Sequence, residues 1–277
     1  MNNNVLIGYK QRDNFVDRLT GTTKLIGMIA LSVIGMVSFD TRFLLVLTIC
    51  SLALFRISGI KFHEVSFVLG FITVFSILNL IAVYIFGPRY GVYLYGSEHV
   101  IWQGIGPYNL TWEQLFYEFN LFLKYIFTVP LALIFLMTTN PSEFSSSLNR
   151  IGISYRISYA VSLALRYIPD VQNDYRQISR AQQARGNEIS KKGKITHRVK
   201  VAAQILLPLI FPSLDRIETI SQAMELRRFG KLKKRSWYAA RPMKRNDFLA
   251  LIVIVLVVLI GVYLFKVNAG RFYDPFN

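Results

Sequence analysis

Two arginines follow the same short pattern at two places in the chain. In "ISRAQQARG" (178–186) and "ISQAMELRR" (220–228), Ile, Ser, Ala and Arg recur in register, so that Arg185 corresponds to Arg227. A guanidinium is planar and makes forked hydrogen bonds to carboxylates or carbonyls. The alternative is that each arginine only interacts with the negative end of a helix dipole, which contributes about 0.3–1 kcal/mol. The repetition favours a partner with two equivalent grooves.

Patterns for catalysis or metal binding are weak by comparison. "KKGKIT" (191–196) looks like a phosphate-binding loop, but Glu188 stands where glycine is needed and Ile195 where Ser or Thr should follow the lysine. Cys50 is the only cysteine, which excludes a disulfide within the chain and a cysteine metal cluster. The three histidines are scattered: His63, His99 and His197. We therefore expect a non-enzymatic chain that binds no metal and no cofactor itself.

A long amphipathic helix must position Arg185. Apolar residues recur three or four positions apart before it, which indicates one helical stripe about six turns long. Pro169 lies inside the stripe and should kink the helix or start a second one. Gly186 sits where a left-handed helix cap is expected. The stripe consists of Val161, Leu165, Ile168, Val171, Tyr175, Ile178 and Ala181.

A second amphipathic segment, from about 199 to 228, carries Arg227. Pro208 and Pro212 are expected to break it. Its apolar face near the end consists of Ile217, Ile220 and Met224. A shorter helix should precede both, because Asn140, Pro141 and Glu143 form a helix start, with an end at about Leu148.

The rest of the chain is typical of a membrane protein. It is 53% hydrophobic and 17% charged, which argues against an ordinary soluble domain. Residues 65–86 and 248–265 carry no charge and approach the roughly 20 residues that cross a bilayer. Residues 115–137 form a third candidate span. Residues 25–39 and 43–55 are shorter; two tilted helices joined by a tight turn are favoured, because one helix would bury two charges at mid-membrane.

The charge distribution predicts the topology. Of the 32 Lys and Arg residues, 18 fall within 176–245, where only four residues are acidic. The positive-inside rule places this arm and the N-terminus in the cytoplasm, and the loop 87–112 outside. We therefore expect an all-α polytopic protein of the cell membrane with about five spans. Its divisions would be a membrane domain at 1–137, a cytoplasmic domain at 138–246, and a last span with a short outer tail at 247–277.

Four stretches in this order resemble one family over most of the chain. They are "DRLTGTTKL" (17–25), "TTNPSEF" (138–144), "LALRYIP" (163–169) and "AQQARG" (181–186). The last contains the Ala-Arg-Gly signature of the T components of energy-coupling factor (ECF) transporters, the CbiQ/EcfT family. The second signature departs from the family pattern, because Leu226, Arg227 and Arg228 stand in its place. Its cap is expected to differ, with Gly230 as a delayed cap.

The resemblance implies a function. This chain would be the transmembrane coupling subunit of an ABC-type importer of a vitamin or similar micronutrient. Two cytoplasmic ATPase subunits would bind the ATP and receive the helix ends, and a substrate-binding membrane S subunit would contact the apolar faces. The residues implied at the ATPases are Ala184, Arg185, Gly186, Arg227 and Arg228. Those implied at the S subunit are Val161, Leu165, Ile168, Val171, Ile217, Ile220 and Met224.

Two other classes of function remain open at this point. A membrane anchor could use the basic arm, including the cluster at 231–235, to bind anionic lipid headgroups of the bilayer. Nucleic acid is not an expected partner, since electrostatic binding leaves the repeated helix ends unexplained. A channel or self-contained secondary transporter would place an ionisable group at mid-membrane. Lys124, with Pro130 nearby, is the candidate; snorkelling or a subunit contact is the favoured explanation for it.

Overall fold

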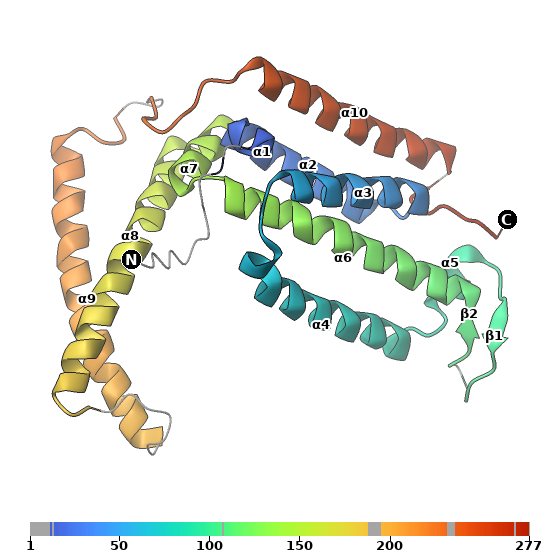
Figure 1. Ribbon diagram of the computed structural model, residues 1–277, viewed down its shortest axis with the longest axis horizontal. Coiled ribbons are helices and arrows are strands. Elements are labelled where there is room, and N and C mark those ends of the chain that lie inside the picture. The colour runs from blue at the N-terminus through green and yellow to red at the C-terminus, as the bar shows by residue number, and fades with distance from the viewer. Residues whose placement is uncertain are drawn as a thin grey trace. The chain divides into compact units, whose positions relative to one another are not determined.

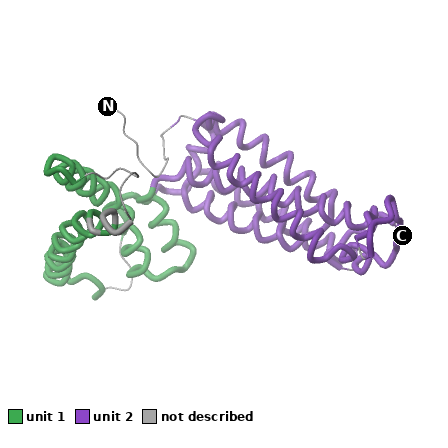
Figure 2. The backbone as a smooth tube through the Cα atoms, turned by 90° about the horizontal axis from the view of Figure 1, so that it is seen from below, with its two compact units in different colours: residues 1–6, 141–240 green, residues 7–140, 241–277 purple. Residues whose placement is uncertain are grey.

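The computed structural model describes residues 12, 14–106, 108–187, 195–231, 236–268 and 270–276. Most of Glu188–Thr196 and of the basic cluster 231–235 therefore lies outside the described residues. Helices dominate, as the sequence predicts for an all-α membrane protein (Figure 1). The chain forms two compact units, one of residues 141–240 and one of residues 7–140 and 241–277 (Figure 2). We call them the arm unit and the membrane unit.

The membrane unit contains most of the apolar helices. Its elements are α1 (Phe15–Arg18), α2 (Gly21–Val37), α3 (Thr41–Ile57), α4 (Phe62–Phe86), α5 (Tyr90–Tyr95), β1 (Val100–Trp102), β2 (Leu110–Thr111), α6 (Trp112–Thr138) and α10 (Arg245–Val267). Among the described residues, α4, α6 and α10 are long and apolar enough to cross a membrane. At 17 residues each, α2 and α3 would extend about 26 Å, slightly less than the hydrocarbon core. The five-span topology stays a prediction.

The turn between α2 and α3 confirms that the first apolar region is two helices. Asp40 caps α3, because its Oδ1 accepts hydrogen bonds from the backbone N–H of Arg42 at 3.0 Å and of Phe43 at 3.4 Å. The Nδ2 of Asn268, just beyond α10, donates to Asp40 Oδ2 at 2.7 Å. Asp40 is fully buried. It therefore caps the N-terminus of α3 and also binds the residue that follows α10.

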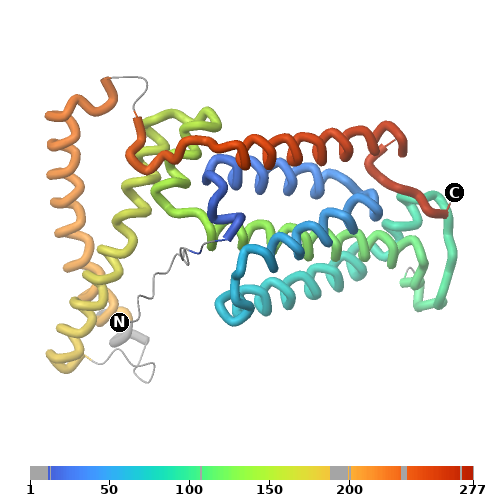
Figure 3. Tube along the Cα trace, turned by 45° about the horizontal axis from the view of Figure 1, so that its top comes forward, coloured from blue at the N-terminus to red at the C-terminus, as the bar shows by residue number. Residues whose placement is uncertain are grey.

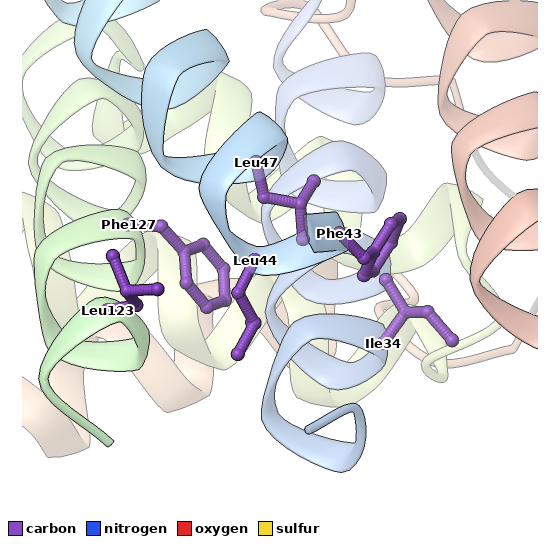
Figure 4. Close-up of a cluster of buried hydrophobic side chains, with 6 residues drawn as sticks. All are labelled: Ile34, Phe43, Leu44, Leu47, Leu123 and Phe127. Atoms are coloured by element: carbon purple, nitrogen blue, oxygen red, sulfur yellow. The ribbon is translucent and has the colours of Figure 1, made fainter. Parts of the chain in front are cut away.

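The core of the membrane unit lies where α3 packs against α6. Figure 4 shows Leu44 beside Leu123 and Phe127, with Phe43 next to Ile34 of α2 (Figure 4). A Cβ atom at Gly35 would collide with the Phe127 ring, so α2 approaches α6 closely because this position has no side chain.

A lysine from α2 and a lysine from α6 each donate a hydrogen bond to a carbonyl at the C-terminal end of the other helix. Lys24 Nζ donates to the carbonyl of Thr138, the last residue of α6, at 2.8 Å. Lys124 Nζ donates to the carbonyl of Met36, in the last turn of α2, at 2.7 Å. It also lies 3.0 Å from the centroid of the Phe39 ring. Positive charge at a helix C-terminus is favourable. The expectation that Lys124 snorkels or contacts another subunit is wrong: its side chain is buried by this chain.

Asp247 makes the equivalent connection at helix N-termini. Its Oδ1 accepts from the backbone N–H of Thr20 at 2.7 Å and from Thr23 Oγ1 at 3.0 Å, at the start of α2. Its Oδ2 accepts from the backbone N–H of Lys244 at 2.8 Å, at the start of α10. One buried carboxylate therefore satisfies donors at two helix N-termini, where negative charge is favoured.

The arm unit consists of α7 (Pro141–Arg150), α8 (Tyr155–Ala184) and α9 (Ile195–Leu226). Helix α7 begins at Pro141, as predicted, and ends two residues later than expected. Helix α8 continues through Pro169. The predicted break in α9 is wrong, because the helix continues through Pro208 and Pro212; its axis bends along the way (Figure 1).

An aromatic cluster holds the end of α9 against the start of α8. Phe229 lies against Tyr155 and Tyr159, with ring centroids 5.6 and 4.7 Å away. Trp237 joins the cluster and its Nε1 donates to Asn149 Oδ1 at 3.1 Å, which adds α7. The first turn of α8, the end of α7 and the residues after α9 are therefore packed together.

Candidate functional site: two helix ends and the groove between them

The C-terminal end of α8 is closed by a Schellman motif. Ala184 is the last helical residue, Arg185 is the C-cap, and Gly186 has φ +82°. The N–H of Gly186 donates to the Gln183 carbonyl at 3.0 Å, and the N–H of Asn187 donates to the Gln182 carbonyl at 3.1 Å. These two hydrogen bonds define the motif. The left-handed glycine cap predicted from the sequence is confirmed.

The end of α9 is closed by the same two hydrogen bonds. The N–H of Arg228 donates to the Glu225 carbonyl at 2.8 Å, and the N–H of Phe229 donates to the Met224 carbonyl at 2.9 Å. Arg227 is therefore the C-cap, as Arg185 is in α8. Arg228 stands in the place of Gly186, with φ +55°. We call 184–186 the α8 tip and 226–228 the α9 tip.

The shared motif corrects one expectation about the second helix end. A different cap, delayed to Gly230, is wrong, although Gly230 does have φ +82°. Arg228 instead takes the left-handed conformation, which costs a residue with a side chain roughly 1–2 kcal/mol. Among the described residues it is the non-glycine with a positive φ. The match of Arg227 with Arg185 therefore holds in geometry as well as in sequence.

The two tips lie at opposite ends of an antiparallel helix pair. Three contacts follow the pair from end to end: Arg156 Nη2 donates to the Gly230 carbonyl at 3.1 Å, Arg216 Nη2 pairs with Asp174 Oδ2 at 3.1 Å, and Gln182 Nε2 donates to the Gln204 carbonyl at 3.3 Å. Figure 3 shows α8 and α9 crossing with their C-terminal ends far apart (Figure 3). A 30-residue helix such as α8 is about 45 Å long.

All five residues predicted to contact ATPases are exposed at these tips. Ala184, Arg185 and Gly186 are exposed in the α8 tip, and Arg227 and Arg228 in the α9 tip. Each arginine thus leaves the end of a long helix at a position fixed by main-chain hydrogen bonds. The backbone that carries each guanidinium is therefore ordered before binding, so only the side chain loses conformational freedom when it binds an acceptor.

An apolar groove of about 430 Å³ lies between α8 and α9, well inside the two tips. We call it the α8–α9 groove. Its α8 wall consists of Ala160, Leu163, Ala164, Tyr167 and Val171, and its α9 wall of Ser213, Arg216, Ile217, Ile220, Ser221 and Met224. Its lining is almost wholly apolar, with Arg216 held at the rim by Asp174.

The structure gathers four of the seven residues predicted to contact a substrate-binding subunit. Val171, Ile217, Ile220 and Met224 line the α8–α9 groove. The remaining three, Val161, Leu165 and Ile168, lie on α8 but outside the groove lining. Of these, Val161 and Leu165 are half-buried and Ile168 is 38% exposed.

Apart from Val171, the α8 wall of the groove was not predicted from the sequence. Ala160, Ala164, Tyr167 and Val171 are also spaced four, three and four apart, so the helical period was present. The stripe through Leu165 and Ile168 has larger aliphatic side chains and therefore gave the stronger signal. Small residues matter here because they leave the space that forms the groove.

Comparison with known proteins places the chain in a family. The family model described as "Cobalt transport protein" (CbiQ) matches residues 12–238. The chain belongs to this family. Among similar curated proteins, the energy-coupling factor transporter transmembrane protein EcfT of Streptococcus thermophilus is 28% identical, over 94% of this chain and 98% of that protein. EcfT of Lactococcus lactis is 25% identical, over 96% of this chain and 99% of that protein.

One further similarity is to a protein with a different name. A putative ABC transporter ATP-binding protein of Bifidobacterium longum is 28% identical over 167 residues, which are 57% of this chain and 21% of that protein. The matched CbiQ region contains the whole of α8 and α9, so the two tips lie inside the part of the chain that defines the family. This chain is a membrane protein of a transport family.

Proposed function

We propose that this chain is the T component of an ECF-type importer of the cell membrane. It would couple two cytoplasmic ATPase subunits to a separate substrate-binding membrane subunit. The observation that carries this proposal is the pair of Arg-bearing Schellman caps at opposite ends of one antiparallel helix pair. The full-length similarity to EcfT proteins supports it, as does the segment of similarity within a protein named for ATP binding.

Each tip would enter a groove on one ATPase subunit. Arg185 and Arg227 are suited to carboxylates or carbonyls at the bottom of such a groove, because a guanidinium offers several donors in a fixed plane. The ATP would be bound by the ATPase subunits, and this chain would bind no cofactor. The N-terminus and the arm unit would face the cytoplasm, where their basic residues favour the inner side of the bilayer.

The helix pair would transmit motion as two long rigid helices that contact each other at several points along their length. Closure of the ATPase dimer would change the separation of the tips, and helices that are about 45 Å long would carry that change along their length. The Asp174–Arg216 ion pair and the Gln182–Gln204 hydrogen bond connect α8 to α9 between the tips. A change in the crossing of the helices must therefore alter the α8–α9 groove.

The α8–α9 groove is the proposed contact for the substrate-binding subunit. Val171, Ile217, Ile220 and Met224 would pack against apolar side chains of that subunit. Burial of one Leu-sized side chain contributes roughly 1.5–3 kcal/mol, so a few such contacts could hold a subunit that must still move during turnover. The cargo would be a vitamin or similar micronutrient, chosen by the substrate-binding subunit.

Charge reversal at the tips tests the proposal. The complex is purified through this chain with Arg185→Glu, with Arg227→Glu, and with both changes. Each single change should weaken one ATPase contact, by about 2–5 kcal/mol if the contact is buried, and the double change should remove both ATPases and abolish ATP-driven uptake in proteoliposomes. Arg180→Glu is the matched control, since Arg180 is exposed on α8 one turn before the tip. Normal ATPase content and uptake in the double variant would refute the proposal.

A further inference from the structure

The two tips have the same backbone geometry but differ at one position. Gly186 and Arg228 follow the C-cap arginines, and both have a left-handed backbone. Glycine adopts this conformation freely, whereas an arginine is strained in it. The cap is closed by main-chain N–H groups, so the arginine side chain is not needed to close it.

The strained residue is held firmly on both sides. Helix α9 precedes it, and Phe229 after it lies in the aromatic cluster with Tyr155 and Tyr159. The surroundings therefore impose the conformation of Arg228, which is how strained residues persist at functional positions. As a result the α9 tip exposes two adjacent arginines, Arg227 and Arg228, where the α8 tip exposes only Arg185.

We propose that Arg228 makes the two tips non-interchangeable, by directing the α9 tip to an ATPase groove that carries a second acidic group. Its guanidinium would bind a carboxylate that is absent from the groove that receives Arg185. The two tips would then select different ATPase subunits, and the complex would have one fixed orientation. This inference rests on the proposed coupling function and adds the residue that sets its specificity.

Crosslinking from the tips tests which ATPase each one meets. A photo-crosslinking residue is placed at Ala184 or at Leu226 in the purified full complex, and the crosslinked ATPase is identified by mass spectrometry. In the otherwise wild-type complex, each tip should label one ATPase species. Arg228→Asn removes the charge and keeps a residue that tolerates a left-handed backbone; the preference of the α9 tip should fall by at least about tenfold.

A swap provides the reciprocal test. A Cβ atom at Gly186 would have no neighbour within 4 Å, so an arginine there meets no clash and carries the same left-handed strain that Arg228 already bears in the α9 tip. Gly186→Arg combined with Arg228→Gly should exchange the two species. Labelling of the same species by both tips, or an unchanged preference in both Arg228→Asn and Arg228→Gly, would overturn the specificity role while leaving coupling intact. If wild-type tips label no ATPase at all, the coupling function itself fails.

Discussion

Arg185 and Arg227 occupy the same position of the same capping motif, each at the end of a long helix of the arm unit. Their backbone N–H groups also make the same hydrogen bond, to the carbonyls of Ala181 and Ala223 at 3.2 Å. The proposed coupling function requires two such helix ends, one for each ATPase subunit. The equivalence also shows where the two ends differ, at Gly186 and Arg228.

The cap of α8 should tolerate alanine at position 186 better than valine. Both residues are strained at φ +82°, and the β-branched valine is more restricted. Open space around this Cβ position means that the penalty is conformational and not steric. ATP-driven uptake should therefore fall more in Gly186→Val than in Gly186→Ala. Gly152→Val is the control, because Gly152 is also left-handed and unobstructed but precedes α8, at the opposite end from the α8 tip. Wild-type uptake in both Gly186→Ala and Gly186→Val would show that the cap geometry does not matter.

Replacement of Lys124 tests the self-contained transporter as an alternative. Lys124 donates a hydrogen bond to the Met36 carbonyl at the C-terminal end of α2. Lys124→Met should lower the melting temperature, because the carbonyl loses this donor and faces an apolar side chain instead. ATP-driven uptake by the assembled complex should persist at temperatures where the variant is folded. If Lys124→Met instead abolishes uptake in a complex with unchanged melting temperature, a transport role for this lysine would be indicated.

A charge in the α8–α9 groove should release the substrate-binding subunit. Ile220→Glu would bury a carboxylate among Met224, Ile217 and Val171, which is costly without a partner. The subunit should be lost while both ATPases stay bound. Thr219→Glu is the matched control, since Thr219 is exposed on α9 outside the groove lining. Full retention of the subunit in Ile220→Glu would exclude the groove as its docking site.

The turn between α2 and α3 should make stability depend on acid pH. Burial raises the pKa of Asp40, but hydrogen bonds from Arg42 and Asn268 outweigh it and hold that pKa below its ordinary value of 3.8. The stabilisation is therefore present above that value and is lost as the pH falls through the lower folded-state pKa. Melting temperatures of the detergent-purified chain should fall in this window. Asp40→Asn should lower stability at neutral pH and flatten the acid dependence; an unchanged profile would contradict the assignment.

The local features of the fold were predictable because they depend on residues close together in sequence. Asp40 separates two apolar runs, and Gly186 ends an amphipathic stripe, so the α2–α3 turn and the α8 cap could be predicted. The left-handed Arg228 could not, because it accompanies long-range packing of Phe229 on α8 that the local sequence does not reveal. Helix α9 also continues through two prolines, although the local preference of proline is to break a helix.

Contacts between distant segments were beyond the sequence. Lys24 binds a carbonyl 114 positions away and Lys124 binds one 88 positions away. Asp247 accepts hydrogen bonds from the start of α2, more than 220 positions away. The groove was half predicted: periodicity identifies a helical face, but not which of two neighbouring stripes meets the other helix. The domain boundaries and the roles of the tip residues stay predictions.

Measurement of the distance between the two tips, with and without bound ATP, is the most direct test of coupling. Cys50 is the only cysteine, so Cys50→Ser gives a background for spin labels at Ala184 and Leu226, both exposed. Pulsed electron paramagnetic resonance would compare the complex without nucleotide and with trapped ATP. We predict that the label–label distance shifts on ATP binding, and that the shift disappears in Arg185→Glu/Arg227→Glu. Identical distance distributions in both nucleotide states, with both ATPases bound, would contradict it.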